Sequence, residues 1–271
     1  MKEYSGPANA FVSHPWGSLW GDMVLAVCNK LPRDSFVWVD LFAVRQWPGS
    51  DADLNFRGVI KLCDMAIVSV SPVEELKDFI LSTKSARDDF LYGSVAGKTV
   101  RRASPFFRLW CIVEIAACVE NAKKVYIQSG KAIRIDTDDS WKYHYDTECV
   151  GMLMNNLQHM IDIERADYKK QEDYDREMNY IENGVGVQQV NDMVIAQVKI
   201  AIIRIESERI QEVVDVRVSQ NQNEQVDFSE STDSQDSDES NDSDSNDASN
   251  HVTIEEKVET IKKTTTEHAP P

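Results

Sequence analysis

Apolar residues along the first half of the chain follow two patterns: short continuous runs, typical of buried strands, and a spacing of three or four residues, typical of helices. Short apolar runs predict four strands, at residues 11–13, 36–42, 65–71 and 124–127. The run 36–42 is continuous except for Asp40, which is typical of a strand buried on both faces of a sheet. Residues 133–135 predict a fifth strand or an extension of the fourth.

The segments between these runs predict helices and loops. Apolar residues three or four positions apart predict helices at 19–31, 56–63 and 73–82. A further helix is expected to begin at Ser104-Pro105, with Ser104 as N-cap and Pro105 at the first helical position, and to end near residue 121. Residues 45–55 predict a loop. The polar and basic residues 83–103 predict an insertion or a mobile loop.

Strands that alternate with helices indicate βαβ units. We therefore expect an α/β fold over residues 9–135, with a flavodoxin-like parallel sheet of four to five strands and helices on both faces. Ligands of such sheets bind at the carboxyl ends of the strands. The side chains expected there are those of His14, Trp16, Asp40, Ser69 and Ser71.

The second half of the chain has a different character. Residues 150–182 and 187–216 predict helices, so residues 136–216 are interpreted as a helical extension packed on the sheet domain. The apolar positions of the last helix permit a coiled-coil seam, but packing within the domain is favoured. Residues 217–271 are rich in Ser and Asp and have little apolar surface to offset the entropy of ordering. They predict a disordered acidic tail.

Charge narrows the function classes. The 271 residues include 46 acidic and 29 basic side chains, for a formal charge of −17. Residues 219–271 carry −11 of this charge, and residues 1–218 carry −6. A general nucleic-acid binder is disfavoured, because it needs a basic face. A flavodoxin-like phosphate or nucleotide binder lacks support, since no Gly-rich phosphate loop is found.

Targeting and cysteine signals favour a cytoplasmic protein. No run of 18 apolar residues predicts a membrane span, and residues 1–10 lack the apolar core of a signal peptide. The five cysteines are odd in number and widely spaced. Cys28, Cys111 and Cys118 lie within apolar runs, so they are interpreted as reduced core thiols, and neither a disulfide framework nor a metal site is expected.

Four segments resemble one family. FVSHPWG, FVWVDLFAV, CDMAIVSVS and RLWCIVEIAACVENAKKVYI are similar to the TIR (Toll/interleukin-1 receptor) domain, and in particular to the divergent TIR-like proteins of protists and algae. The resemblance covers residues 9–130, and its most specific element is W-C-x-x-E at 110–114. Residues 161–166 and 186–191 resemble the helical extension of the protist proteins. The chain departs from the pattern at His14, where an aromatic residue is commoner, and in its long insertion at 83–103.

The resemblance implies two functional classes. Some TIR domains are signalling scaffolds that associate with themselves or with other TIR-like proteins through the so-called BB loop, here 45–55. Others cleave NAD at the nicotinamide–ribose bond and require no cofactor. The implied catalytic residue is the glutamate of W-C-x-x-E, which is Glu114. The candidate NAD pocket consists of His14, Trp16, Asp40 and Trp110.

A single carboxylate suits this chemistry. Loss of nicotinamide builds positive charge on the ribose, which a carboxylate stabilises, and the cationic leaving group needs no general acid. The helical period of residues 109–119 places Glu114 opposite the apolar face, pointing away from the core. An ordinary solvated glutamate is the alternative. Asp40 is open to a second interpretation as a carboxylate that hydrogen-bonds the backbone of the following loop, and His14 as a structural histidine beside a turn.

Phosphorylation is a further hypothesis. Arg101-Arg102-Ala103-Ser104 fits a basophilic kinase site, although the N-cap role already accounts for Ser104. The acidic tail suits acidophilic kinases. The sequence thus favours a TIR-like signalling and assembly module, with an NAD nucleosidase as the alternative.

Overall fold

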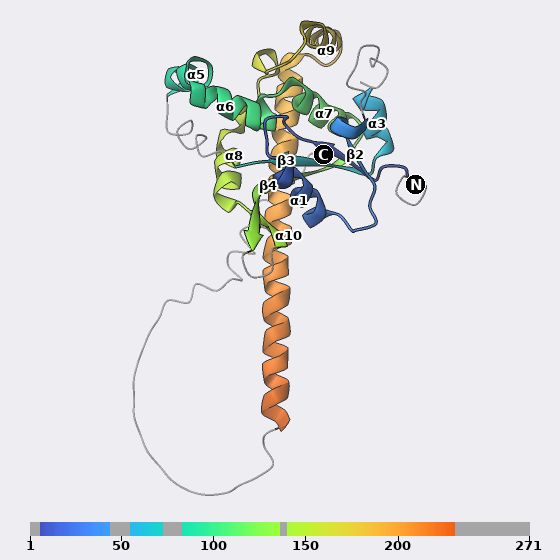
Figure 1. Ribbon diagram of the computed structural model, residues 1–271, viewed down its shortest axis with the longest axis vertical. Helices are drawn as coiled ribbons and strands as arrows, with labels where there is room; N and C mark the ends of the chain where they lie inside the picture. Colours follow the sequence, from blue (N-terminus) through green and yellow to red (C-terminus); the bar gives the residue numbers. More distant parts are fainter. Residues whose placement is uncertain (1–5, 44–54, 73–82, 136–139, 231–271) are drawn as a thin grey trace, which may run out of the picture. The chain divides into compact units, whose positions relative to one another are not determined.

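The computed structural model describes residues 6–43, 55–72, 83–135 and 140–230 (Figure 1). The predicted helix 73–82 and nearly all of the predicted loop 45–55 lie outside the described residues. The chain divides into two units, Met1–Val218 and Ser219–Pro271. The fold below is that of the first unit. In the second unit, the described residues form the last part of one helix.

A five-stranded sheet organises the first unit. Its strands lie in the order β2-β1-β3-β4-β5. The first four strands pair in parallel, and β5 pairs antiparallel with β4. The strands are β1 (Ala10–Ser13), β2 (Val37–Val39), β3 (Met65–Val70), β4 (Lys124–Ile135) and β5 (Ser140–Tyr145). This is the order of a flavodoxin-like sheet, so the predicted fold class is confirmed.

Strand β2 is shorter and more exposed than its apolar run predicts. It ends at Val39, and a one-turn helix, α2 (Asp40–Ala43), follows. Leu41 is 46% exposed and Phe42 is 75% exposed. The prediction of a strand buried on both faces is wrong because β2 forms the edge of the sheet, where only β1 pairs with it.

Helices cover both faces of the sheet, because successive side chains of a strand point to opposite sides. Val12 of β1 packs with Met23 of α1 (Trp20–Lys30). Its neighbour Phe11 belongs to the larger core on the other face. That core includes side chains of α3 (Phe56–Leu62), α7 (Leu109–Glu120) and α8 (Thr147–Met160).

Residues 83–103 form two helices, so the prediction of an insertion loop is wrong. The helices are α5 (Lys84–Gly93) and α6 (Val95–Ala103). The Thr83 hydroxyl accepts a hydrogen bond from the Ala86 amide, and the Ser94 hydroxyl accepts one from the Gly97 amide. These caps satisfy the first turns of two helices whose composition is mostly polar. Each helix contributes a buried anchor, Leu91 or Val100, to the core.

The segment after α6 corrects the interpretation of Ser104. Residues Pro105–Phe107 form a single 3-10 turn, and α7 begins only at Leu109. Phe106 and Phe107 are both buried, which draws this turn into the core. The Ser104 hydroxyl is buried and has no hydrogen-bond partner among the described residues, so it caps no helix. At 3% exposure Ser104 is also inaccessible to a kinase in this fold.

The C-terminal part of the first unit contains shorter helices and more turns than its apolar pattern predicts. The 3-10 turn η4 (Ile163–Arg165) separates α8 from α9 (Gln171–Asn183), and strand β5 was not predicted. The last helix, α10 (Val187–Glu230), continues beyond residue 216 and into the segment expected to be disordered. Five of its apolar residues at heptad-like spacing are buried in the core: Val190, Val194, Val198, Ala201 and Ile205. Residues 231–271 lie outside the described residues.

The corner between α5 and α6 yields a stability prediction. A Cβ on Gly97 would lie 2.0 Å from the Phe90 carbonyl oxygen, whereas a Cβ on Gly93 would meet nothing within 4 Å. We expect Gly97→Ala to destabilise the protein by about 1–3 kcal/mol through overpacking. Gly93→Ala, the control, is expected to change stability by less than about 1 kcal/mol. Urea unfolding of both variants checks this. Equal effects would contradict the packing of α5 on α6.

Candidate functional site

The candidate site is built around a hydrogen bond between the first strand and the central helix. Ser13 is the last residue of β1, and its hydroxyl donates to the Glu114 carboxyl oxygen Oε2 at 2.6 Å. Ser13 is 2% exposed and Glu114 is 6% exposed. The bond therefore joins two buried polar groups at the carboxyl end of a parallel strand, where this fold class binds ligands.

The orientation of Glu114 differs from its prediction. Helix α7 is buried on nearly all sides, and only Trp110, Val119 and Glu120 among its residues are not buried. One side of α7 contacts the sheet, and on another side α3 and α9 bring Arg57 and Arg176 to it. Glu114 faces β1 rather than pointing away from the core. Ser13, its partner, was not singled out by sequence reasoning.

Burial sets the protonation state of Glu114. It raises the pKa of this carboxyl well above 4.5, because removal from water disfavours the charged form. The Ser13 hydrogen bond acts in the opposite direction, and the negative charge of Asp40 raises the pKa further. In this environment the neutral carboxyl is favoured.

Asp40 gathers the other predicted residues of this edge. The Trp16 indole Nε1 donates to Asp40 Oδ2 at 2.7 Å, and the Leu41 amide donates to Asp40 Oδ1 at 2.7 Å. The second bond joins Asp40 to the backbone of α2, whereas nearly all of the loop 45–55 that the second interpretation of Asp40 named lies outside the described residues. Three of the four candidate pocket residues, His14, Trp16 and Asp40, thus lie together.

His14 also belongs to this cluster. Its Nδ1 lies 3.7 Å from Asp40 Oδ1, which is too long for a hydrogen bond. Nδ1 is buried and has no hydrogen-bond partner in the described part of the chain. Burial lowers the pKa of His14 below 6.5, and Asp40 opposes this shift. A buried nitrogen without a partner beside a carboxylate is a group that a ligand could satisfy.

Trp110 is the predicted residue that the structure places in a different cluster. Its ring packs edge-on against Phe56 with centroids 4.9 Å apart, and the Arg176 guanidinium lies 5.6 Å from its centroid. Trp110 lines a cleft of about 210 Å³ together with Tyr180 and Val113. The structure therefore does not add Trp110 to the cluster of His14, Trp16 and Asp40.

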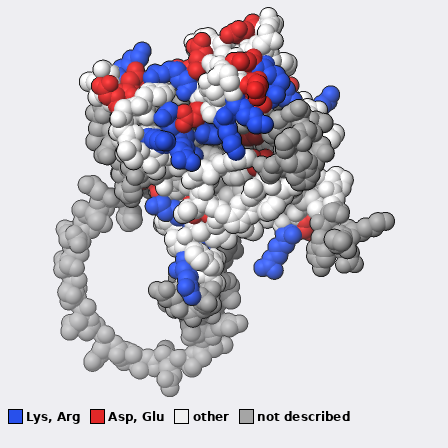
Figure 2. Space-filling view, turned by 45° about the horizontal axis from the view of Figure 1, so that its top comes forward, with Lys and Arg blue, Asp and Glu red and all other residues white. Residues whose placement is uncertain are grey.

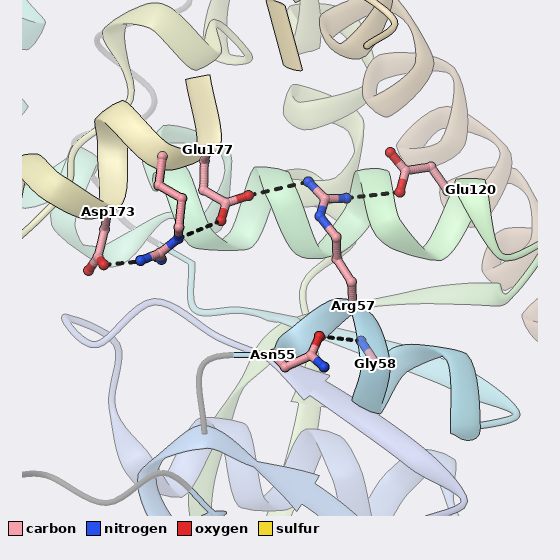
Figure 3. Close-up of polar contacts among 7 residues, drawn as sticks. Asn55, Arg57, Gly58, Glu120, Asp173 and Glu177 are labelled. Carbon is pink, nitrogen blue, oxygen red and sulfur yellow. Dashed lines mark hydrogen bonds and ion pairs between the residues drawn. The ribbon is translucent and has the colours of Figure 1, made fainter. Parts of the chain in front are cut away.

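The charges beside the Trp110 cleft are paired with one another (Figure 3). Arg57 of α3 reaches Glu120 of α7 at 2.8 Å and Glu177 of α9 at 3.3 Å. Arg176 contacts Asp173 at 3.1 Å and Glu177 at 3.4 Å. This network connects α3, α7 and α9 beside the cleft, so we interpret it as structural.

The remaining polar groups and thiols add little reactive chemistry. Ser69 and Ser71 of the β3 end are buried, and the Ser71 hydroxyl has no hydrogen-bond partner among described residues. All five cysteines are free. Cys28 is exposed, so its prediction as a core thiol is wrong, whereas burial raises the pKa of Cys111 far above that of an active thiol. The described residues contain no group of metal-ligating side chains.

An exposed apolar surface adjoins the Asp40 cluster. We call it the Trp20–Phe42 patch, since these two rings pack edge-to-face with centroids 5.4 Å apart. Each of its residues is at least 45% exposed: Trp16, Leu19, Trp20, Leu41 and Phe42. Sequence reasoning missed this patch because it assigned residues 41 and 42 to a buried strand.

Comparison of the chain with protein-family models, with curated proteins and with solved structures gave no match. In the described segments, no helix is long and apolar enough to cross a membrane.

The raised pKa of Glu114 predicts a pH-dependent stability. A carboxyl whose pKa is higher in the folded than in the unfolded protein lowers stability as pH rises from 4.5 toward the folded-state pKa. Glu114→Gln keeps an acceptor for Ser13 and removes this titration. We expect the variant to gain stability relative to the parent protein as pH increases from 4.5 to about 8. Urea unfolding across this range measures the difference. Parallel stability curves would contradict a buried, neutral Glu114.

Proposed function

We propose that the chain is a TIR-like signalling and assembly module that acts through self-association. The observation that supports this most is the Trp20–Phe42 patch. It lies shortly before residues 45–55 in the chain, the segment that the family resemblance equates with the BB loop. The free cysteines are consistent with a cytoplasmic location, where thiols stay reduced.

The patch has the composition of an interface centre. Two Trp and one Phe side chain are exposed together, and aromatic residues dominate the binding energy of protein interfaces. Clustered exposed apolar side chains on a monomer mark interaction sites. Asp40 fixes the Trp16 indole through a hydrogen bond, so part of the patch is held in place before a partner binds. We expect that partner to be a second copy of the chain.

Phe42 provides the test of self-association. It is 75% exposed, so Phe42→Ser should leave folding intact and weaken dimerisation about tenfold or more. Leu62, which is 83% exposed on α3, supplies the control Leu62→Ser. Sedimentation analysis over a concentration series measures the dissociation constants. A parent protein that stays monomeric, or equal weakening by both variants, would contradict assembly through this patch.

A second candidate function is NAD nucleosidase, with Glu114 as the catalytic carboxylate. The observation that favours it is the hydrogen bond of Glu114 to Ser13 at the carboxyl end of β1, with Asp40 directly after β2. Two carboxyl groups and the unsatisfied His14 nitrogen at this edge provide anchors for ribose hydroxyls. Trp16, partly exposed, offers a ring face for stacking.

The positive charge of the substrate would counteract the effect of burial on the ionisation of Glu114. The nicotinamide ring of NAD is cationic, and a nearby positive charge favours an ionised carboxyl. As the glycosidic bond breaks, positive charge moves onto the ribose, where ionised Glu114 would stabilise it. The nicotinamide leaves as a neutral molecule and needs no proton. Activity would thus require ionised Glu114 and would increase with pH.

Nicotinamide release from NAD tests this candidate. We expect Glu114→Gln to lower the rate about 100-fold or more, because an amide carries no negative charge. Glu120→Gln on the same helix serves as control and is expected to retain the rate. The rate of the parent protein should increase as pH rises through the raised pKa of Glu114. Release that is absent, or is equal in Glu114→Gln, would exclude this function.

A further inference from the structure

A second cleft lies outside the site at the carboxyl ends of the strands. Its volume is about 300 Å³, and it lies where α5 meets the end of α8 and the turn η4. Its apolar base includes Leu91, Phe107 and Met160. The walls are polar and carry charged side chains. The proposed function uses none of these residues.

Four basic side chains from three elements line this cleft. Lys84 and Arg87 come from α5, His159 comes from the last turn of α8, and Arg165 comes from η4. Figure 2 turns the top of the molecule in Figure 1 toward the reader. Lys and Arg side chains gather on this face, with acidic side chains among them. The basic residues therefore converge although the chain as a whole is acidic.

His159 lies close enough to Arg87 and Lys84 to be affected by their charges. Burial lowers the pKa of His159, and the charges of Arg87 and Lys84 lower it further. Its ring Nε2 approaches the Gln158 amide nitrogen at 3.5 Å, at the limit of a hydrogen bond. Like charges that converge in a cleft raise each other's free energy, and a bound anion would offset this cost.

The carboxylates of the cleft already have partners. Asp88 accepts from Arg165 at 3.0 Å, and Asp162 accepts from the Glu164 amide at 3.2 Å as the N-cap of η4. Lys84 has no ion-pair partner among the residues that the structure describes. The two acidic groups thus leave Lys84 and His159 available to a ligand.

Arg165 is held in position before any ligand binds. Its guanidinium lies 4.3 Å from the centroid of the Tyr92 ring, and Arg101 lies 4.7 Å from the same centroid. Its ion pair with Asp88 fixes a second direction. A guanidinium fixed in this way loses little rotamer entropy when it binds an anion.

We propose that this cleft binds the phosphate group of a small phosphorylated metabolite. An ammonium, two guanidinium groups, an imidazole and the Tyr92 hydroxyl are the donors that phosphate oxygens accept from. The volume is at the lower end of small-molecule pockets, which suits a sugar phosphate better than a dinucleotide. The proposal concerns other residues than the proposed function and does not rest on it.

Titration calorimetry of the full chain with inorganic phosphate and with ribose 5-phosphate tests the proposal. We expect saturable binding of both, tighter for the sugar phosphate, and none of ribose. Lys84→Gln should weaken binding about fivefold or more, whereas Lys98→Gln on the exposed side of α6 should leave it unchanged. Binding that fails to saturate, or equal weakening by the two variants, would overturn the proposal.

Sulfate keeps its charge between pH 7.5 and 5.5, whereas phosphate titrates in this range. Binding of sulfate therefore reports the titration of His159 and not that of the ligand. A bound anion raises the pKa of His159, so affinity should increase as pH falls from 7.5 to 5.5. The groups that line the cleft around it are Lys84, Arg87, Asp88, Tyr92, Asp162 and Arg165. In His159→Gln the affinity should lose most of this pH dependence. A parent protein whose sulfate affinity is independent of pH would contradict the role of His159.

Discussion

The arrangement of side chains at the carboxyl edge of the sheet depends on the buried hydrogen bond between Ser13 and Glu114. This bond joins β1 to α7 through residues that are 101 positions apart. A buried carboxyl is costly when charged, so burial favours its neutral form, and the serine hydroxyl satisfies part of its hydrogen-bonding capacity. His14 and Trp16 follow Ser13 in the chain, and both lie close to Asp40.

Asp40 connects an inner and an outer part of this edge. Inward, its charge raises the pKa of Glu114. Outward, it accepts from the Trp16 indole and from the Leu41 amide, which belong to the exposed Trp20–Phe42 patch. The inner part offers the chemistry of a buried acid, and the outer part offers apolar area for a partner.

The local sequence pattern predicted the strands of the sheet, but it did not predict which distant segments cover each helix. Four short apolar runs were enough to predict the strands, and their alternation with helices predicted parallel pairing, because both signals are local in the sequence. The period of α7 placed Glu114 opposite one apolar face. That inference failed because segments distant in the chain, including Arg57 and Arg176, cover the helix from other sides. The helices at 83–103 were missed because their signals were two N-caps, Thr83 and Ser94, within polar sequence.

The protonation of Glu114 is the central claim, and carbon-13 NMR of side-chain carboxyl groups measures it directly. Chemical shifts of glutamate-labelled protein are followed over pH, and the Glu114→Gln variant assigns the signal. We expect Glu114 to titrate well above 4.5, because burial disfavours its charged form. A Glu114 signal that titrates at 4.5 or below would contradict a buried neutral acid at the centre of this site.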